Sequence, residues 1–177
     1  MIRLARESDI DAVAEIYSHI HDGEEMGLST VGWSRNVYPT RKTAIDALAR
    51  GDMYVIELEG KVAGCAIINK TQLDGYFTAN WKYKAEPDEV LVLHTLSIDP
   101  VHKGKGLGRT FVNYYEQMAR ESGCKVLRID TQKKNVSARA LYQKLGFIES
   151  DFLVCDFTAS TAYSSCFLKR KFKNGRA

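Results

Sequence analysis

The sequence predicts an α/β (α+β) domain, in which strands and amphipathic helices follow one another along a single chain. Three observations support this prediction. The apolar, β-branched run Val90–Ile98 is typical of a buried strand. Residues 53–58 and 62–69 flank Glu59-Gly60, a pattern typical of a tight β-hairpin. Four apolar residues further on recur at the spacing of a helix face: Leu107, Phe111, Tyr115 and Met118.

The N-terminal region predicts one strand and two helices. Residues 2–6 alternate apolar and charged side chains, as a half-buried strand does. Ser8 or Asp9 then caps a helix, which we expect to end where the polar stretch 19–27 breaks its pattern. The apolar face of this helix has five members: Ile10, Val13, Ile16, Tyr17 and Ile20.

A second, shorter helix is predicted between Thr40, a favourable N-cap, and Gly51, a favourable C-terminal stop. Its inward face is expected to consist of three apolar residues: Ile45, Leu48 and Ala49. The stretch 70–89 is predicted to be a long loop. Its aromatic residues are Tyr76, Phe77, Trp81 and Tyr83. They either cover a substrate or pack on the sheet, and packing is the interpretation we favour.

The second half of the chain predicts two further helices and three further strands. A helix from about Gly106 ends at Ser122-Gly123, and Asn135 is a favourable N-cap for the next one. The expected strands are 125–130, 147–157 and 164–172. In the helix after Asn135, four residues are expected to form the apolar side: Val136, Ala140, Leu141 and Leu145. The opposite side has three residues: Asn135, Arg139 and Tyr142. If Tyr142 had no function, it would be expected to lie on the surface.

Composition limits the classes of protein to consider. A chain of 177 residues is long enough for one domain, which we expect to span 1–177. Its net charge of +3 is too small to indicate nucleic acid by itself. Four scattered cysteines without a C-x-x-C pair favour reduced thiols, and no signal segment is evident, so a cytoplasmic protein without a metal is expected. The basic tail 169–176 is interpreted as a strand end and a solvated terminus.

A glycine-rich basic turn follows the strand 90–98. Asp99-Pro100 ends the strand, and three glycines come within the next eight residues: Gly104, Gly106 and Gly108. Free N–H groups at a helix start, together with the helix dipole, form a site for a phosphate group. The spacing fits neither the P-loop nor the dinucleotide fingerprint.

Two motifs resemble the GNAT-type N-acetyltransferases, whose pyrophosphate loop is Gln/Arg-x-x-Gly-x-Gly/Ala. Here the first reads Lys103-Gly-Lys-Gly-Leu-Gly108, so that a lysine stands where the family usually has Gln or Arg. The second, Asn135-Val-Ser-Ala…Tyr142-Gln-Lys-Leu-Gly-Phe147, resembles the family's Asn-x-x-Ala…Tyr-x-Lys-x-Gly-Phe segment. The resemblance covers about residues 1–150. It implies the GNAT fold, a mixed, mostly antiparallel sheet of six to seven strands with about four helices, splayed at its central strand.

The resemblance also implies acetyl-CoA as cofactor, a core for binding it at about 90–147, and transfer of its acetyl group to a primary amine. The residues implied to contact acetyl-CoA, through backbone or side chain, are Leu96, Ser97, Ile98, Lys103, Gly104, Lys105, Gly106, Leu107, Gly108, Arg109, Asn135, Arg139 and Tyr142. By the same resemblance, Tyr142 protonates the departing thiolate and the backbone N–H of Leu96 holds the oxyanion. The amine is deprotonated by His94, by Glu89 as a second choice, or through ordered water.

The family places acceptor recognition between the first two strands, here about residues 18–40. The candidates for contact with a small-molecule or peptide amine are Asp22, Glu24, Glu25, Trp33 and Tyr38. Two other classes of function stay open. One is a catalytically silent acyl-CoA-binding sensor or scaffold of the same fold, and the other is a nucleic-acid-associated protein that uses the basic tail. A homodimer also stays open, and no membrane association is expected.

Overall fold

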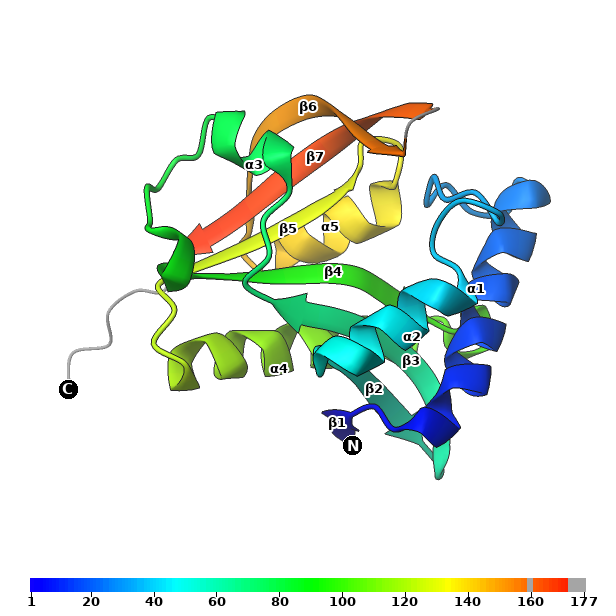
Figure 1. The fold of residues 1–177 in the computed structure, drawn as a ribbon. Coiled ribbons are helices and arrows are strands. Elements are labelled where there is room, and N and C mark those ends of the chain that lie inside the picture. The colour runs from blue at the N-terminus through cyan, green and yellow to red at the C-terminus, as the bar shows by residue number, and fades with distance from the viewer. Residues whose placement is uncertain (159–160, 172–177) are drawn as a thin grey trace.

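The computed structural model describes residues 1–158 and 161–171, and in this part of the chain seven strands form one sheet (Figure 1). The order is β1-β2-β3-β4-β5-β7-β6, and each neighbouring pair is antiparallel except β4 and β5. The expected mixed, mostly antiparallel sheet is therefore confirmed. The strands are β1 (Ile2–Leu4), β2 (Met53–Leu58), β3 (Lys61–Asn69), β4 (Val90–Ile98), β5 (Val126–Gln132), β6 (Ile148–Thr158) and β7 (Thr161–Lys171).

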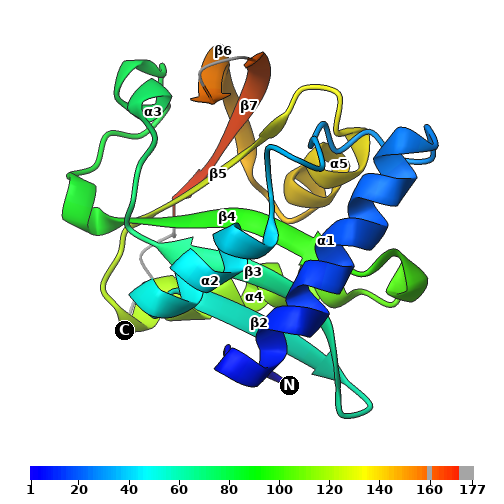
Figure 2. The same cartoon turned by 45° about the vertical axis from the view of Figure 1, so that its right-hand side comes forward.

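Helices cover both faces of the sheet (Figures 1 and 2). One face packs against α1, α2 and α3, and the other packs against α4 and α5. The described residues contain five α-helices where about four were expected, because the stretch 70–89 is not one uninterrupted loop. It contains the short helix α3 and a 3₁₀ turn, Pro87–Glu89. The helices are α1 (Ile10–Glu25), α2 (Arg41–Arg50), α3 (Asp74–Thr78), α4 (Leu107–Glu121) and α5 (Val136–Lys144).

The N-terminal helices agree with the expectation in one case and differ from it in the other. Helix α1 ends at Glu25, inside the stretch 19–27, and its last turns are held by Asp22 and Glu25, which both pair with Arg35, at 2.5 and 2.9 Å. These ion pairs give the polar last turns a partner that the hydrophobic pattern does not reveal. In α2 the inward residues are Ala44, Ala47 and Leu48, whereas Ile45 is 45% exposed. Small alanines let α2 approach closely, so the larger side chain lies outside.

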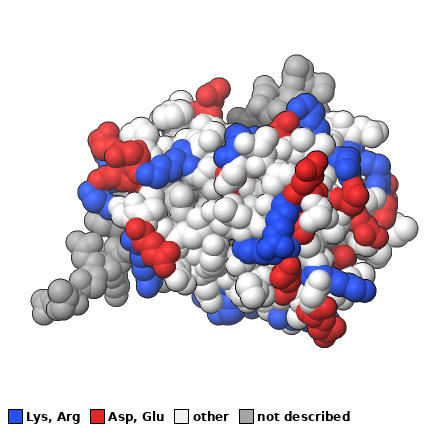
Figure 3. Space-filling model, turned by 60° about the horizontal axis from the view of Figure 1, so that its bottom comes forward, with Lys and Arg blue, Asp and Glu red and all other residues white. Residues whose placement is uncertain are grey.

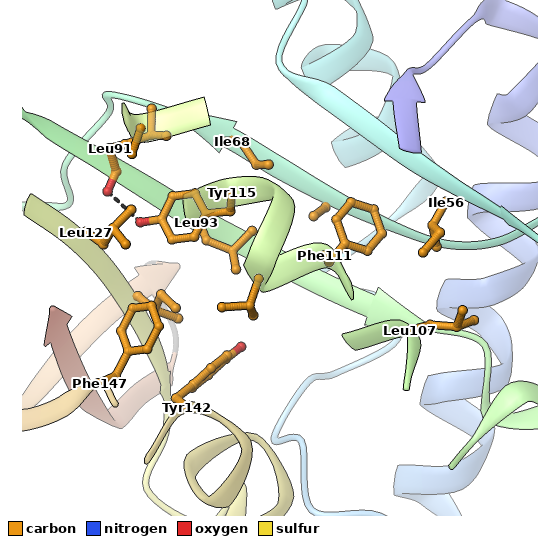
Figure 4. Close-up of a cluster of buried hydrophobic side chains, with 14 of the residues drawn as sticks. Ile56, Ile68, Leu91, Leu93, Leu107, Phe111, Tyr115, Leu127, Tyr142 and Phe147 are labelled. Atoms are coloured by element: carbon orange, nitrogen blue, oxygen red, sulfur yellow. Dashed lines mark hydrogen bonds between the residues drawn. The ribbon is translucent and has the colours of Figure 1, made fainter. Parts of the chain in front are cut away.

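The main core lies between the sheet and α4, and it is centred on the stripe that the sequence predicts (Figure 4). Leu107, Phe111 and Tyr115 are buried there. The hydroxyl of Tyr115 lies 2.6 Å from the carbonyl oxygen of Leu91 in β4 and accepts a hydrogen bond from the N–H of Arg128 in β5, at 3.1 Å. One buried side chain of α4 thus ties together the two central strands.

Strand β4 is paired on both sides only in its first half. It pairs with β5 from Val90 to Leu93, and the two strands then diverge (Figure 1). On its other side β4 has a bulge, because the two residues between His94 and Ser97 face the single residue between Ile67 and Cys65 of β3. Within this bulge Thr95 has a φ of 51°, in the left-handed region. The expected splay at the central strand is confirmed.

The expected faces of α5 were wrong for two residues, Val136 and Tyr142. Val136 is 67% exposed, whereas Tyr142 is buried at 4% exposure and its ring lies 6.0 Å from that of Phe147. Tyr142, from the side that was expected to be polar, therefore packs into the core, together with Leu141 and Leu145 from the expected apolar side. Asn135 does cap the helix, and its side chain accepts a hydrogen bond from the N–H of Ala138 at 3.2 Å.

The C-terminal hairpin and the surface complete the fold. Lys169–Lys171 lie at the end of β7, and residues 172–176 of the basic tail lie outside the described residues. On the face shown in Figure 3, basic and acidic side chains are mixed around a mostly uncharged centre. A helix of the length and apolarity needed to cross a bilayer does not occur among the described residues.

Candidate active site

A cavity of about 1270 Å³ lies where β4 and β5 diverge. One wall consists of the second half of β4, the β4–α4 turn and α5. The other consists of the end of α1, the connection between α1 and α2, and the end of β5. Both ribbon views place this connection beside the start of α5 (Figures 1 and 2).

The β4–α4 turn presents unpaired backbone donors to this cavity. Gly104 and Gly106 have φ values of 84° and 78°, which a glycine adopts without strain. Within the described residues, the N–H groups of 106–109 donate no hydrogen bond, and the first N–H of the helix with an acceptor is that of Thr110, bonded to the carbonyl of Gly106. Four free amides at the N-terminus of a 15-residue helix are an arrangement of donors that could hold an anion.

Two basic side chains stand at the same end of the cavity. Lys103 and Arg109 both line it, together with all three glycines of the turn. A Cβ at Gly108 would lie 3.2 Å from a methyl group of Leu141, so this glycine allows α4 and α5 to pack closely. The donor set of amides and cations fits a diphosphate.

Tyr142 brings a phenol to the wall formed by α5. Its hydroxyl points away from α5 and toward α4 (Figure 4), and no residue of the described chain forms a hydrogen bond with it. Burial raises the pKa of Tyr142 well above its ordinary value of 10.0. The phenol is therefore protonated at neutral pH and is available as a proton donor.

His94 lies on β4, at the point where the strand leaves β5, and it lines the cavity. Its Nε2 lies 3.1 Å from the carbonyl oxygen of Thr71, and its Nδ1 lies 3.9 Å from a carboxylate oxygen of Asp130. Burial lowers the pKa of His94 below 6.5, although Asp130 acts in the opposite direction. The imidazole is therefore neutral at pH 7 and can accept a proton.

The opposite wall contains two of the aromatic residues predicted to recognise the acceptor. Trp33 and Tyr38 line the cavity and contact each other edge to face, with ring centroids 6.1 Å apart. The Tyr38 hydroxyl is hydrogen-bonded to that of Thr95 in the bulge of β4. Burial raises the pKa of Tyr38 to about 12, so it stays neutral there. This hydrogen bond connects the acceptor-side segment to the central strand.

Six of the predicted residues do not line the cavity. Ser97 is buried and its hydroxyl donates to the carbonyl of Thr95; Lys105 extends toward His102. The other four have charged partners: Arg139 with Glu149, Glu89 with Lys125, Glu25 with Arg35 and Glu24 with Lys134. Each of these four side chains would have to break its ion pair before it could contact acetyl-CoA or the acceptor as predicted.

Three titratable residues of the cavity that were not candidates in the sequence have hydrogen-bonded partners within the described residues. His19 and Asp99 face each other with Nδ1 3.2 Å from a carboxylate oxygen, and Asp130 accepts a hydrogen bond from Tyr76 at 2.8 Å. Asp130 carries a signal that could have been used, because Arg128, Asp130 and Gln132 place polar residues at every second position of a strand. His19 carries no such signal, because its partner lies 80 residues away.

The fold and the cavity define an α/β protein in which unpaired amides at the start of α4 and a protonated tyrosine line the same cavity. Residues 12–147 match the model of the acetyltransferase (GNAT) family. The chain belongs to this family.

Relatives with names and solved structures agree with this assignment. L-amino acid N-acyltransferase MnaT of Escherichia coli (strain K12) is 29% identical over 152 residues, 83% of this chain and 78% of that protein. The structure of a GNAT-family acetyltransferase from Streptococcus agalactiae superposes with a TM-score of 0.80 at 22% identity, and the match covers 98% of this chain and 95% of that one. Salmonella typhimurium yncA, solved with its cofactor acetyl-CoA, has a TM-score of 0.70 at 20% identity and covers 100% of this chain and 96% of its own. The two solved structures share the fold.

Proposed function

We propose that this protein transfers the acetyl group of acetyl-CoA to a primary amine, by direct attack of the amine within a ternary complex. The observation that supports this most is the combination on one cavity wall of four free amides at the start of α4, an unpaired edge of β4 and the phenol of Tyr142. Family membership supports acyl transfer, and the name of MnaT and the acetyl-CoA bound to yncA support this donor and an amine acceptor.

The cavity wall offers a place for each part of acetyl-CoA. The diphosphate would accept hydrogen bonds from the amides of 106–109 and contact Lys103 and Arg109. The pantetheine arm would lie along the edge of β4 that β5 leaves unpaired, next to the backbone of Leu96 and Ile98. The side chain of Asn135 is already engaged with the N–H of Ala138 and the hydroxyl of Thr131, so its proposed contact would be an additional one.

Two residues would carry out the two proton transfers, His94 at the acceptor amine and Tyr142 at the thioester sulfur. His94 takes a proton from the acceptor ammonium, and the nitrogen lone pair then forms a bond to the thioester carbonyl carbon. The backbone N–H of Leu96 donates to the oxygen on which negative charge develops. When the carbon–sulfur bond breaks, the thiolate takes the hydroxyl proton of Tyr142, and the second proton that the nitrogen loses on becoming an amide restores the phenol. The acetylated amine and free coenzyme A result, and His94 gives up its proton to solvent.

Two measurements on the full chain test this proposal. Titration calorimetry with acetyl-CoA determines whether the cavity binds the donor, and thiol release over a panel of amines determines whether acetyl transfer follows. We expect binding and amine-dependent release of thiol, with mass spectrometry showing one added acetyl group on the acceptor. Binding without thiol release from any amine would refute the transferase and favour a silent acyl-CoA-binding protein. Absence of binding would refute both.

A further inference from the structure

The first two residues beyond the β4–β5 pairing form a pair of titratable groups. Leu93 and Ile129 are the last paired residues of the two strands, so His94 and Asp130 are the next residue on each. Neighbouring residues of adjacent strands point to the same face of a sheet. Both side chains line the cavity, and they are 13% and 16% exposed, respectively.

The hydrogen bond of His94 determines which of its ring nitrogens is basic. The partner of Nε2 is the carbonyl oxygen of Thr71, which can only accept a hydrogen bond. Nε2 therefore carries the proton of the neutral ring, and the lone pair resides on Nδ1. This nitrogen faces the Asp130 carboxylate at 3.9 Å, a distance longer than a hydrogen bond. Nδ1 and the carboxylate oxygen both carry lone pairs, so they form no hydrogen bond while the ring is neutral. A proton on Nδ1 would allow a hydrogen bond between them.

We propose that Nδ1 of His94 is the atom that takes the proton of the acceptor ammonium, and that Asp130 is the positioning residue that stabilises the resulting imidazolium. This inference rests on the proposed acetyl transfer. In the step, one N–H bond of the ammonium breaks and an Nδ1–H bond forms. The amine keeps the electron pair that attacks the thioester carbonyl. The positive charge moves from the ammonium to the imidazole, next to the carboxylate.

The segment 70–89 supports both members of the pair. Thr71 supplies the carbonyl for His94, and the hydroxyl of Tyr76 in α3 donates to Oδ1 of Asp130 at 2.8 Å. Tyr76 is 1% exposed, and its carbonyl accepts a hydrogen bond from the indole N–H of Trp81 at 2.6 Å. The guanidinium of Arg128 in turn lies over the Trp81 ring, 4.2 Å from its centroid. The segment 70–89 therefore covers the sheet and also fixes the positions of His94 and Asp130.

Other charges also act on His94 and set the sign of the expected effect. Burial lowers the pKa of His94, Asp130 and Asp52 raise it, and Arg50 lowers it. The hydrogen bond with Thr71 also raises it. Asp52 is bound to Arg50 and to the side-chain amide of Asn69, whereas Asp130 faces the ring itself. Removal of the Asp130 charge alone should therefore move the titration of His94 to lower pH.

The first experiment needs no turnover. The full chain is labelled with ¹⁵N-histidine, and the ring resonances of His94 are identified by their loss in His94→Gln. We expect the neutral ring to be protonated at Nε2, and Asp130→Asn to move its titration midpoint to lower pH. Asp130→Glu, which keeps the charge, should restore the midpoint toward that of the natural protein. The matched control is Asp99→Asn, a second carboxylate of the cavity, which contacts His19 and should leave the His94 midpoint in place.

The second experiment uses the reaction itself. In the natural protein the acid limb of kcat/KM against pH reports the titration of His94. Asp130→Asn should move this limb to lower pH and reduce the plateau about tenfold, because a less stabilised imidazolium makes a weaker base. Tyr76→Phe keeps the carboxylate but removes its hydrogen bond, so a smaller loss is expected.

The outcomes separate this inference from the proposed function. A neutral ring protonated at Nδ1, or a His94 midpoint that Asp130→Asn leaves unchanged, would overturn the role of Asp130 even in an active enzyme. A chain that acetylates no amine would refute the proposed reaction, while the NMR titration would still decide whether the two groups are coupled. If Asp130→Asn does not fold, as judged by circular dichroism, Tyr76→Phe and Asp130→Glu provide the same comparison.

Discussion

The two walls of the cavity are built on different principles. The donor-side wall, formed by β4, the β4–α4 turn and α5, has its polar donors concentrated in one short stretch, 103–109, where the backbone amides of 106–109 are unpaired at the start of α4. The acceptor-side wall is made of side chains from distant parts of the chain, held by contacts such as Tyr38 with Thr95 and Tyr76 with Asp130. A wall of backbone amides depends on glycines and one helix start. A wall of side chains can change by single substitutions while the fold is preserved.

The largest effect is expected where the donor-side wall is changed. Gly106→Asp adds a side chain at a φ of 78° and a negative charge beside the free amides of 106–109. We expect coenzyme A to bind at least about 100-fold more weakly by titration calorimetry, a loss of about 2.7 kcal/mol. The matched control is Gly51→Asp at the end of α2, with a φ of 75° and open space around its Cβ, as at Gly106. Equal affinities in the two variants would place the diphosphate elsewhere.

The next effect concerns the phenol of Tyr142, on the α5 part of the same wall. Tyr142→Phe removes the hydroxyl proton but keeps the buried ring against Phe147. We expect kcat to fall about 100-fold, because general acid catalysis contributes factors of this size, while the Kd for acetyl-CoA stays within about twofold. Tyr54→Phe, which changes a tyrosine packed against Tyr114 outside the cavity, serves as the control. An unchanged kcat in Tyr142→Phe would exclude the role as acid.

A smaller effect is expected on the acceptor-side wall. Trp33→Ala removes the ring that contacts Tyr38 at the cavity. Steady-state kinetics should show a rise of about fivefold in KM for the amine, about 1 kcal/mol, and an unchanged KM for acetyl-CoA. Trp33→Phe should retain part of the affinity for the amine. If KM for acetyl-CoA rose instead, the division of the cavity into two walls would be wrong.

The smallest effect is expected for the ion pair that joins the walls. Glu24 contacts Lys134 at 2.9 Å and accepts a hydrogen bond from the N–H of Gly32 at 3.0 Å. A double-mutant cycle of Glu24→Gln and Lys134→Gln, measured by urea unfolding, should give a coupling of at most about 1 kcal/mol that decreases with salt. A coupling that salt does not change would contradict an electrostatic contact.

The same pair has a defined pH dependence. Burial raises the pKa of Glu24, but Lys134 and the N–H of Gly32 outweigh this and leave it below 4.5. A carboxyl group with a lowered pKa in the folded state stabilises the protein above its unfolded pKa, and this contribution is lost as the pH falls through the folded value. The difference in unfolding free energy between the natural protein and Glu24→Gln should therefore decrease below about pH 4.5. A difference that grows toward acid pH would refute this assignment.

The contrast between the walls also explains what the sequence could predict. The strand Val90–Ile98, the glycine turn and the Asn135 cap are local features, because each depends on neighbours within a few residues. The hydrogen bond between Tyr76 and Asp130 and the ion pair of Glu24 with Lys134 join residues 54 and 110 positions apart. Local periodicity carries no information about such pairs.

Tyr142 shows where the argument from periodicity fails. Helical spacing placed it opposite the apolar stripe, because Val136 was counted as an inward residue. In the structure Val136 is exposed, and the buried side of α5 is formed by Ala138, Leu141, Tyr142 and Leu145. Which face of a short helix is buried depends on its neighbours β6 and α4, and the helix sequence alone does not contain them.

The unpaired edge of β4 has a consequence for solubility. At the rim of a sheet, a bare strand edge recruits further polypeptide and so promotes aggregation. From His94 to Ile98 this edge faces the interior of the cavity, between α5 and the connection that follows α1. The backbone hydrogen-bonding groups of this edge are therefore accessible to a narrow, extended ligand in the cavity but not to a strand of another protein molecule.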